Sequence, residues 1–467
     1  MMPVSGRRAA ALFIILAAAC RMRGADIPAL LAERVRSVVA VEYFTETESE
    51  RRTTVAYGTV IDDRGTIILP PGAIDGHVPP AQLKDFKVFV PGDPSNGAGT
   101  YLGQDAYTGW HFVRADEKIR ERLVPVTRFA AARHAPVPVL GDEVWGIGLR
   151  PLEEDFMPYY LGSHLALVQS LPQLTGEAQQ EVAGPGLPVF NRDGVLVGLG
   201  LNSGGQPYVL YSQANRGGAP VYLVDVEESS LFLLAGEVLP YLNRIPGRVD
   251  GRPLAWLGAD GLAPMDRDVA DFLKLGGHSG AVVSEVLEGS PAERAGMKDH
   301  DIIIAIDGSP LPVFRPTRYV TEYVDREVER RRPGDVMTLT VLRGSERLTL
   351  MATLGDQPTL IREAKRKYFD RIGFTAREFV YGDAVDRRTR VVNSAGVIVH
   401  YVKPNTPASI AGLEPDDWIK DIDGVAVRSF ADAVDKLSAI EFDPLRSEFV
   451  LLVSRGGDTA VLHVKLK

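Results

Sequence analysis

The stretch from Gly280 to Gly308 reads GAVVSEVLEGSPAERAGMKDHDIIIAIDG, and it returns 116 residues later, from Gly396 to Gly424, as GVIVHYVKPNTPASIAGLEPDDWIKDIDG. The two stretches align without a gap, and twelve of the 29 aligned positions are identical. They include the opening glycine, alternating apolar residues, the Pro-Ala and Ala-Gly pairs and the closing Asp-Gly. Such self-similarity indicates two copies of one structural unit. Each copy predicts a strand, a short helix that begins at proline and ends at glycine, and a strand that ends in an Asp-Gly turn.

The order of these elements and the pattern S/T-P-A-x-x-A-G-(M/L)-x-x-x-D resemble a PDZ domain of the bacterial protease-associated type. The resemblance implies two α+β modules, at residues 252–356 and 371–467. The charged segment between them, residues 357–370, is expected to be a solvated helical linker. A generic repeated β-rich module is the alternative, because its turns would also require glycine and proline.

Length and composition leave room for a larger domain in front of the repeat. The chain has 467 residues, of which 45% are hydrophobic and 24% charged, a balance typical of folded domains with substantial cores. The net charge is -9, and no basic block with interleaved aromatic residues appears, so nucleic acid is not an expected partner. The histidines lack the spacing of a metal site, and no phosphate-binding glycine loop opens a helix. No metal or cofactor is therefore expected.

The N-terminal segment, residues 1–25, reads as an export signal. Arg7 and Arg8 precede an apolar run from Ala9 to Cys20 that is too short to span a bilayer. Cys20 is the only cysteine, so an intramolecular disulfide is excluded. Leu-Ala-Ala-Ala-Cys resembles a bacterial lipoprotein processing site, although its leucine lies one position further from the cysteine than usual. Acylation of Cys20, with a lipid anchor, and plain cleavage nearby both remain open, and incorporation of labelled palmitate distinguishes them.

Between residues 26 and 245 the chain predicts many short strands around turns. The segments are VRSVVAVEYF from Val35, YGTVIDDRGTIILPPGA from Tyr57, LGDEVWGIGLRP from Leu140 and LPVFNRDGVLVGLGLN from Leu187. Such a series favours a pair of closed β-barrels. In order and spacing it resembles the chymotrypsin-like protease domain of the HtrA (Deg) family, in which one or two PDZ modules follow that domain. The predicted fold is therefore mainly β: a double β-barrel followed by two PDZ-like modules.

The resemblance implies a Ser-His-Asp triad, and none of its three residues stands at the matching position. Gly72 occupies the position of the general-base histidine in GTIILPPGAI, and Gly109 that of the orienting aspartate in DAYTGWHFV. Pro185 aligns with the nucleophilic serine in AGPGLPVFNRDG. Proline also lacks the backbone N–H with which the nucleophile residue helps to hold an oxyanion. Ala183 replaces the glycine of the other donor, so the sequence predicts a pseudoprotease.

A shifted triad is the alternative. Asn202-Ser203-Gly204-Gly205 repeats the NSGG tetrapeptide around the family's nucleophile, but it follows the Leu187–Asn202 hairpin, whereas the family's nucleophile precedes that hairpin. His77, Asp105 and Ser203 have the chain order of a triad, and loops tolerate shifts of a few residues. The same residues are also compatible with a turn and two solvated loops.

The PDZ-like modules predict peptide binding through backbone N–H groups of a Φ-G-Φ loop, which receive a terminal carboxylate. The second module has the full pattern, in Ile372, Gly373 and Phe374. The first has the weaker Leu257, Gly258 and Ala259, with Asp260 next in sequence. An acid beside this loop would repel a carboxylate, so the second module is expected to be the better peptide receptor.

Three functions follow from these patterns. The first is an exported HtrA-like pseudoprotease that binds peptides or C-terminal tails as an adaptor, chaperone-like protein or scaffold of the periplasm or cell envelope. The second is an active serine endopeptidase of envelope protein quality control that uses the shifted triad. The third is a scaffold whose modules bind only each other. The resemblance also implies a homotrimer formed through the front domain.

Overall fold

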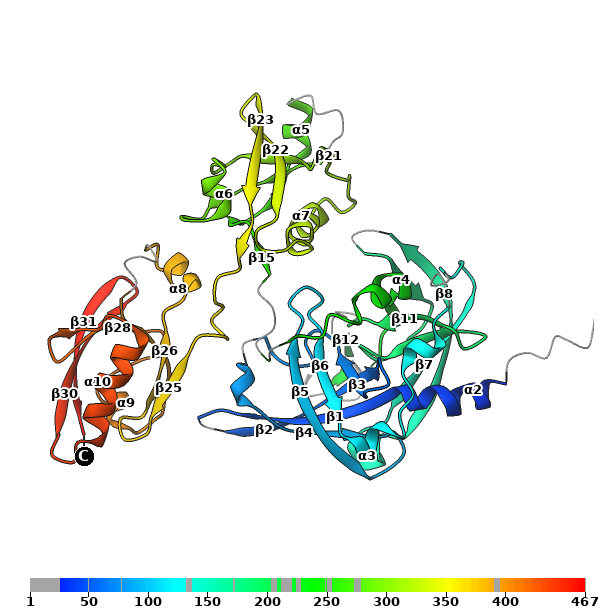
Figure 1. The fold of residues 1–467 in the computed structure, drawn as a ribbon, viewed down its shortest axis with the longest axis horizontal. Coiled ribbons are helices and arrows are strands. Elements are labelled where there is room, and N and C mark those ends of the chain that lie inside the picture. The colour runs from blue at the N-terminus through cyan, green and yellow to red at the C-terminus, as the bar shows by residue number, and fades with distance from the viewer. Residues whose placement is uncertain are drawn as a thin grey trace, which may run out of the picture.

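Two closed β-barrels come first in the chain and two smaller α+β modules follow them (Figure 1). The computed structural model describes residues 26–48, 50–76, 78–131, 137–170, 173–202, 208–210, 221–223, 228–247, 249, 254–272, 279–389 and 395–466. The mainly β architecture, with a chymotrypsin-like double barrel ahead of PDZ modules, confirms the predicted fold class. The export signal and Cys20 lie outside the described residues, and acylation of Cys20 remains a hypothesis. Within the described ranges, none of the helices has the length and apolarity needed to cross a bilayer.

The first barrel closes in the order β1-β2-β3-β6-β5-β4. Its strands are β1 (Val38–Glu46), β2 (Arg51–Val60), β3 (Thr66–Leu69), β4 (Leu83–Phe89), β5 (Asn96–Gln104) and β6 (His111–Ala115). Inward-facing side chains such as Val39, Val41, Ile67 and Val88 form its core. Helix α2 (Ile27–Arg34) precedes the barrel and α3 (Glu117–Arg120) follows it. The apolar runs of the sequence therefore become barrel strands because closure buries their alternate residues.

The second barrel closes in the order β10-β11-β14-β9-β8-β7. Its strands are β7 (Glu143–Leu149), β8 (Pro158–Gln169), β9 (Thr175–Ala178), β10 (Pro188–Asn191), β11 (Leu196–Gly200) and β14 (Leu231–Leu234). A separate hairpin consists of β12 (Tyr208–Leu210) and β13 (Val221–Leu223), and helix α4 (Ala235–Val238) follows β14. Trp145 and Phe190 pack at the centre of the core, with ring centroids 4.9 Å apart.

The first PDZ module has a sheet in the order β17-β18-β20-β22-β23 and two short pairs, β15 with β24 and β16 with β19. Its elements are β15 (Ala255–Trp256), β16 (Ala259–Asp260), β17 (Ala263–Pro264), α5 (Arg267–Phe272), β18 (Ala281–Val282), β19 (Glu285–Val286), α6 (Pro291–Arg294), β20 (Ile302–Ile306), β21 (Ser309–Pro310), α7 (Tyr319–Glu329), β22 (Val336–Arg343), β23 (Glu346–Thr353) and β24 (Gly355–Asp356). Helix α7 buries Val320, Val324 and Val328, a four-residue spacing that places them on one face.

The second PDZ module has one sheet in the order β25-β26-β27-β28-β30-β31, with β29 paired to β28. Its elements are β25 (Arg366–Phe369), β26 (Phe374–Glu378), α8 (Tyr381–Asp386), β27 (Val397–Val402), α9 (Pro407–Ile410), β28 (Trp418–Ile422), β29 (Val425–Ala426), α10 (Phe430–Phe442), β30 (Glu448–Arg455) and β31 (Asp458–Lys465). Strand β25 lies inside the segment that the sequence predicted to be a helical linker. The Pro-Ala helices α6 and α9 occupy equivalent places in the two modules.

The aspartate that ends the repeated pattern has the same structural role in both modules. Asp301 accepts two hydrogen bonds from the guanidinium of Arg343, each 2.8 Å long, and Asp417 accepts two of 2.6 Å from Arg455. Each aspartate also accepts a backbone N–H three residues earlier in the chain. An arginine that binds a carboxylate through two hydrogen bonds fixes the relative orientation of the two groups and also binds more strongly than through one. The pattern therefore holds the Ala-Gly turn against the strand that carries the arginine.

Candidate functional site

Three loops that the sequence placed at the triad positions meet at one cavity between the barrels. A Cβ atom on Gly109 would lie 3.2 Å from the ring of Pro71, the neighbour of Gly72. A Cβ atom on Gly186, the neighbour of Pro185, would lie 2.7 Å from the ring of Pro70. The loops that contain Gly72, Gly109 and Pro185 therefore converge.

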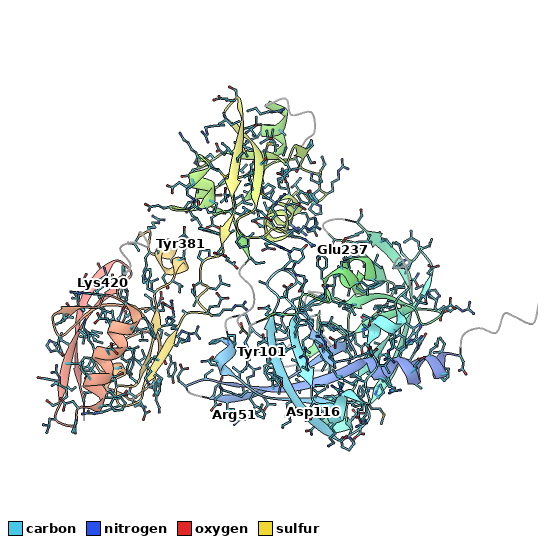
Figure 2. The ribbon with its side chains drawn as sticks, in the orientation of Figure 1. Arg51, Tyr101, Asp116, Glu237, Tyr381 and Lys420 are labelled. Carbon is cyan, nitrogen blue, oxygen red and sulfur yellow. The ribbon has the colours of Figure 1, made fainter. Side chains whose placement is uncertain are left out.

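The cavity at this junction has a volume of about 260 Å³ and a mostly apolar wall. Its described lining residues are Ile68, Leu69, Pro70, Pro71, Tyr107, Thr108, Trp110, Gln173, Gly186, Leu199, Gly200, Leu201, Asn202, Leu233, Glu237, Tyr241 and Arg326. This set contains no serine, cysteine or histidine, and its one carboxylate is that of Glu237. Glu237, next to last in α4, lies on the side of the second barrel that faces α7 (Figure 2). The lining thus offers a shaped apolar surface without a nucleophile and base pair.

Backbone groups around Pro185 are used within the protein. The N–H of Gly186 donates to the carbonyl of Gly200 at 2.8 Å, and the N–H of Leu187 donates to that of Gly184 at 3.0 Å. Ala183 is fully buried and forms a bridge with Ser229. Pro185 has no N–H. Oxyanion stabilisation requires donors that point into the reaction site, and the N–H of Ala183 donates to the carbonyl of Ser229 at 3.4 Å instead.

Asp105, the acid of the alternative triad, is held by other partners. Its side chain is 4% exposed, and its carboxylate accepts the Nε–H of Arg244 at 2.9 Å. It also accepts the backbone N–H of Thr108 at 3.0 Å and the Thr108 hydroxyl at 2.9 Å. Its partners therefore fix the loop from Asp105 to Gly109. His77 and Ser203 lie outside the described residues, so the alternative triad remains a hypothesis.

Helix α7 of the first PDZ module reaches the same cavity, a contact that the sequence did not indicate. Arg326 and Arg330 of α7 donate to the hydroxyl of Tyr107 at 3.3 and 3.1 Å. The guanidinium of Arg244 lies 4.8 Å from the centre of the Tyr107 ring, and the Tyr241 ring lies 5.2 Å from it. Burial raises the pKa of Tyr107, but hydrogen bonds with Arg330, Tyr241 and Arg326 outweigh it and hold that pKa below the ordinary value. Tyr107 therefore joins the cavity to α7.

His111 is a core residue of the first barrel. Its ring is buried, and its Nδ1 lies 2.9 Å from the hydroxyl of Tyr101. It is not among the lining residues of the cavity. Burial, with a smaller effect from the charge of Arg362, lowers the pKa of His111 to about 4. A buried imidazole is disfavoured as a cation, so His111 remains neutral at physiological pH.

We expect the stability of the double barrel to fall as the pH is lowered from about 6.5 toward 4. The pKa of His111 is about 4 in the folded state and about 6.5 in the unfolded state, so the unfolded chain binds more protons across this window. The stability contributed by neutral His111 is present above pH 6.5 and is lost as the pH falls. Urea unfolding followed by tryptophan fluorescence at pH 7 and pH 5 measures the change. His111→Phe should reduce this dependence, and an unchanged slope in that variant would show that other groups cause it.

The two Φ-G-Φ loops have closely similar backbone contacts. In the first module the carbonyl groups of Leu257 and Gly258 accept N–H groups from the α6 region at 2.8 and 2.9 Å. In the second, the carbonyl groups of Ile372 and Gly373 accept the equivalent N–H groups at 3.0 and 2.9 Å. Gly258 has φ +80° and Gly373 has φ +90°, a region that glycine adopts most easily. A Cβ atom at Gly373 would also lie 2.2 Å from the side chain of Thr406. Glycine is therefore required for the loop itself, apart from any ligand.

Carboxylates face each other near the loop of the first module. Burial raises the pKa of Asp325 on α7, and the charges of Asp260 and Glu322 raise it further. Burial, followed by the charge of Asp325, raises the pKa of Glu329 in the same way. This end of the first module is therefore unfavourable for a further carboxylate, which agrees with the expectation drawn from Asp260.

No metal site was expected from the sequence, and the described ranges hold no group of three or more His, Cys, Asp or Glu side chains that could bind a metal ion. Of the residues that the sequence assigned to the peptide-binding loops, Leu257, Ile372 and Phe374 are buried and Ala259 is half-buried. These side chains therefore pack beneath each loop and do not form an exposed surface.

Comparison with known proteins identifies both modules. A PDZ domain model matches residues 262–354, and a second PDZ domain model matches residues 398–441. A probable periplasmic serine endoprotease DegP-like of Hahella chejuensis is 24% identical over 429 residues, which cover 82% of this chain and 85% of that protein. The serine endoprotease DegS of Escherichia coli is 26% identical over 324 residues, 65% of this chain and 78% of that protein.

Solved structures similar to this chain include the HtrA-type protease AlgW with a decapeptide. The match covers 71% of this chain and 98% of the chain of that structure, with a TM-score of 0.49 and 16% sequence identity. The serine endoprotease from Yersinia pestis covers 70% of this chain and 97% of its own, with a TM-score of 0.46 and 16% identity. The chain thus carries two PDZ domains and is homologous to the HtrA/DegP serine endoproteases.

Proposed function

We propose that this protein is an exported HtrA-like pseudoprotease that binds peptides or protein C-terminal tails through its PDZ domains. In this role it is an adaptor, a chaperone-like protein or a scaffold in the cell envelope. The observation that carries the proposal is the lining of the cavity between the barrels, whose described residues include no serine, cysteine or histidine. Gly72, Gly109 and Pro185 stand in the loops that meet there.

Acyl transfer at such a site requires a nucleophile, a base and donors for the developing oxyanion. Glycine supplies no proton acceptor, and proline supplies neither a hydroxyl nor an N–H. The N–H of Ala183, at the position of the second donor, donates to the carbonyl of Ser229 at 3.4 Å. These losses affect each part of the mechanism, which supports the loss of proteolysis as a whole rather than a reduced rate.

The PDZ domains and the relatives support the rest of the proposal. PDZ domains bind extended peptides as an added strand. Several relatives are described as periplasmic, which supports export to the periplasm or envelope. A homotrimer remains an expectation from the resemblance, and a membrane anchor remains one from Cys20.

An active serine endopeptidase is the competing function, because the homologues are serine endoproteases. It would require Ser203 and His77, with Asp105 released from Arg244. Breaking that ion pair would leave the buried carboxylate of Asp105 without its cationic partner, which is costly. The geometry at Asp105 therefore favours the first function.

A fluorophosphonate probe tests the proposal. We expect the full chain to show no covalent labelling and no hydrolysis of casein above background, because the described lining of the cavity contains no serine. An active HtrA-type protease treated in parallel is the positive control. Labelling of the wild type that disappears in Ser203→Ala would establish the endopeptidase and refute the pseudoprotease.

A further inference from the structure

Strand β26 of the second PDZ domain is paired along both of its edges. It pairs with β27 on one side and with β25 on the other, where Arg366 lies opposite Arg377 and Phe369 opposite Phe374. Figure 1 shows β25 and β26 side by side. A PDZ ligand adds as a strand at the edge that follows the Φ-G-Φ loop, between the sheet and a helix. Helix α10 packs against β25. Strand β25 therefore occupies the place of a ligand.

The direction of β25 matches that of a bound C-terminal peptide. It runs antiparallel to β26 and ends at Phe369, beside the loop that would receive a terminal carboxylate. The N–H of Gly373 in this loop donates to the carbonyl of Phe369 at 2.7 Å. The backbone oxygen of Phe369 thus accepts the kind of hydrogen bond that the loop would offer to a carboxylate.

The side chain of Phe369 fills the pocket expected for the last residue of a ligand. It is 0% exposed, and its ring centroid lies 5.5 Å from that of Phe374. The same core cluster contains Leu437 and Ile440 of α10. Burial of an aromatic ring removes a large apolar surface from water, so this residue anchors the strand.

The first PDZ domain lacks this arrangement. Its preceding strand β15 pairs with β24, and in the described part of the domain β16 pairs with β19 alone. The difference between the two copies shows that the repeated fold does not require the loop-proximal edge to be filled. The occupied edge is a property of the second domain.

Other polar side chains of β25 do not make all of their hydrogen bonds when the strand is paired with β26. The Nε and Nη1 atoms of Arg366 and the hydroxyl of Tyr368 are buried and have no hydrogen-bond partner among the residues that the structure describes. Burial, followed by the charge of Arg377, lowers the pKa of Arg366. Each unsatisfied buried polar group opposes the docked state, because release of the strand would return these groups to water.

We infer that Arg366–Phe369 is an internal ligand of the second PDZ groove and has to leave β26 before a protein C-terminus can bind there. This inference rests on the proposed peptide-binding function and names the regulation of that site. The incoming chain pairs with β26 in the same direction, fills the Phe369 pocket and places its carboxylate at Gly373.

The experiment measures binding of a dye-labelled peptide that ends in Arg-Lys-Tyr-Phe with a free carboxylate, using the full chain. Phe369→Ala removes the anchor of the internal strand, so we expect this variant to bind at least about tenfold more tightly than the wild type. Lys367→Ala is the matched control, because Lys367 is exposed on the same strand. Its affinity should equal that of the wild type.

A disulfide gives an independent test. Tyr368 lies opposite Thr375 in the β25–β26 pair, and Tyr368→Cys with Thr375→Cys in a Cys20→Ser background can lock the strand in place. We expect the oxidised form not to bind the peptide and the reduced form to bind it. Equal binding by wild type, Phe369→Ala and both redox forms would overturn the internal ligand and leave the peptide-binding function intact. No binding by any form would overturn the peptide-binding function itself. Equal binding of an amidated peptide to Phe369→Ala would overturn the carboxylate contact.

Discussion

Asp383→Ala should lower the free energy of unfolding of the second PDZ domain by about 3–5 kcal/mol, the range for removing one partner of a buried ion pair. Asp383 accepts two hydrogen bonds of 2.6 Å from the guanidinium of Arg377. The two side chains are 1% and 5% exposed, so water cannot replace the lost carboxylate. Asp383 also accepts the N–H of Val380 at 2.8 Å at the start of α8. Thermal unfolding of the full chain, with the transition of this domain assigned by hydrogen exchange, measures the loss.

Two further variants show whether burial is the cause. Glu414→Ala removes an exposed partner of Arg455, and such a pair contributes about 0–1 kcal/mol. Arg377→Met with Asp383→Leu replaces both charges by apolar groups and should recover much of the stability. A loss for Asp383→Ala no larger than that for Glu414→Ala would contradict the prediction.

The repeat explains how much of the fold the sequence could predict. The Pro-Ala helices and the strands that end in Asp-Gly turns are local signals, and they appear in the structure as α6, α9, β20 and β28. For the segment before the second domain, the structure differs from the prediction. Its charges suggested a solvated helix, yet pairing with β26 made Arg366–Phe369 a strand. Tyr368 and Phe369 at its end were the signal, because an exposed linker has no need for two aromatic rings.

The candidate site likewise has one part that the sequence could predict and another part that it could not. The resemblance placed Gly72, Gly109 and Pro185 in loops that converge, because loop order follows from barrel topology. Contacts between residues far apart in the chain have no local signal. Tyr107 meets Arg330 across 223 positions, and Asp105 meets Arg244 across 139. Such pairs depend on how α7 packs against the barrels. Neither the composition nor the periodicity of the sequence predicts that packing.

Restoring the three triad side chains should not restore proteolysis. We expect Gly72→His with Gly109→Asp and Pro185→Ser to hydrolyse casein no faster than the wild type and to remain unlabelled by a fluorophosphonate. Loss of a working triad costs on the order of 10⁶ in rate, so even a partly assembled one would be detected readily. Circular dichroism of the triple variant checks that the barrels still form.

The reason lies in the backbone rather than in the side chains. Gly72 has φ +85° and Gly109 has φ +72°, which side chains with a Cβ atom rarely adopt, so histidine and aspartate would be strained or misdirected there. Space is available at Gly72, where a Cβ atom would meet nothing within 4 Å, so conformation is the obstacle at that position. Pro185→Ser adds one N–H, but the N–H of Ala183, at the position of the second donor, remains bonded to the carbonyl of Ser229. Hydrolysis by the triple variant that the fluorophosphonate abolishes would show instead that these loops can rearrange, and that the loss of activity rests on three side chains alone.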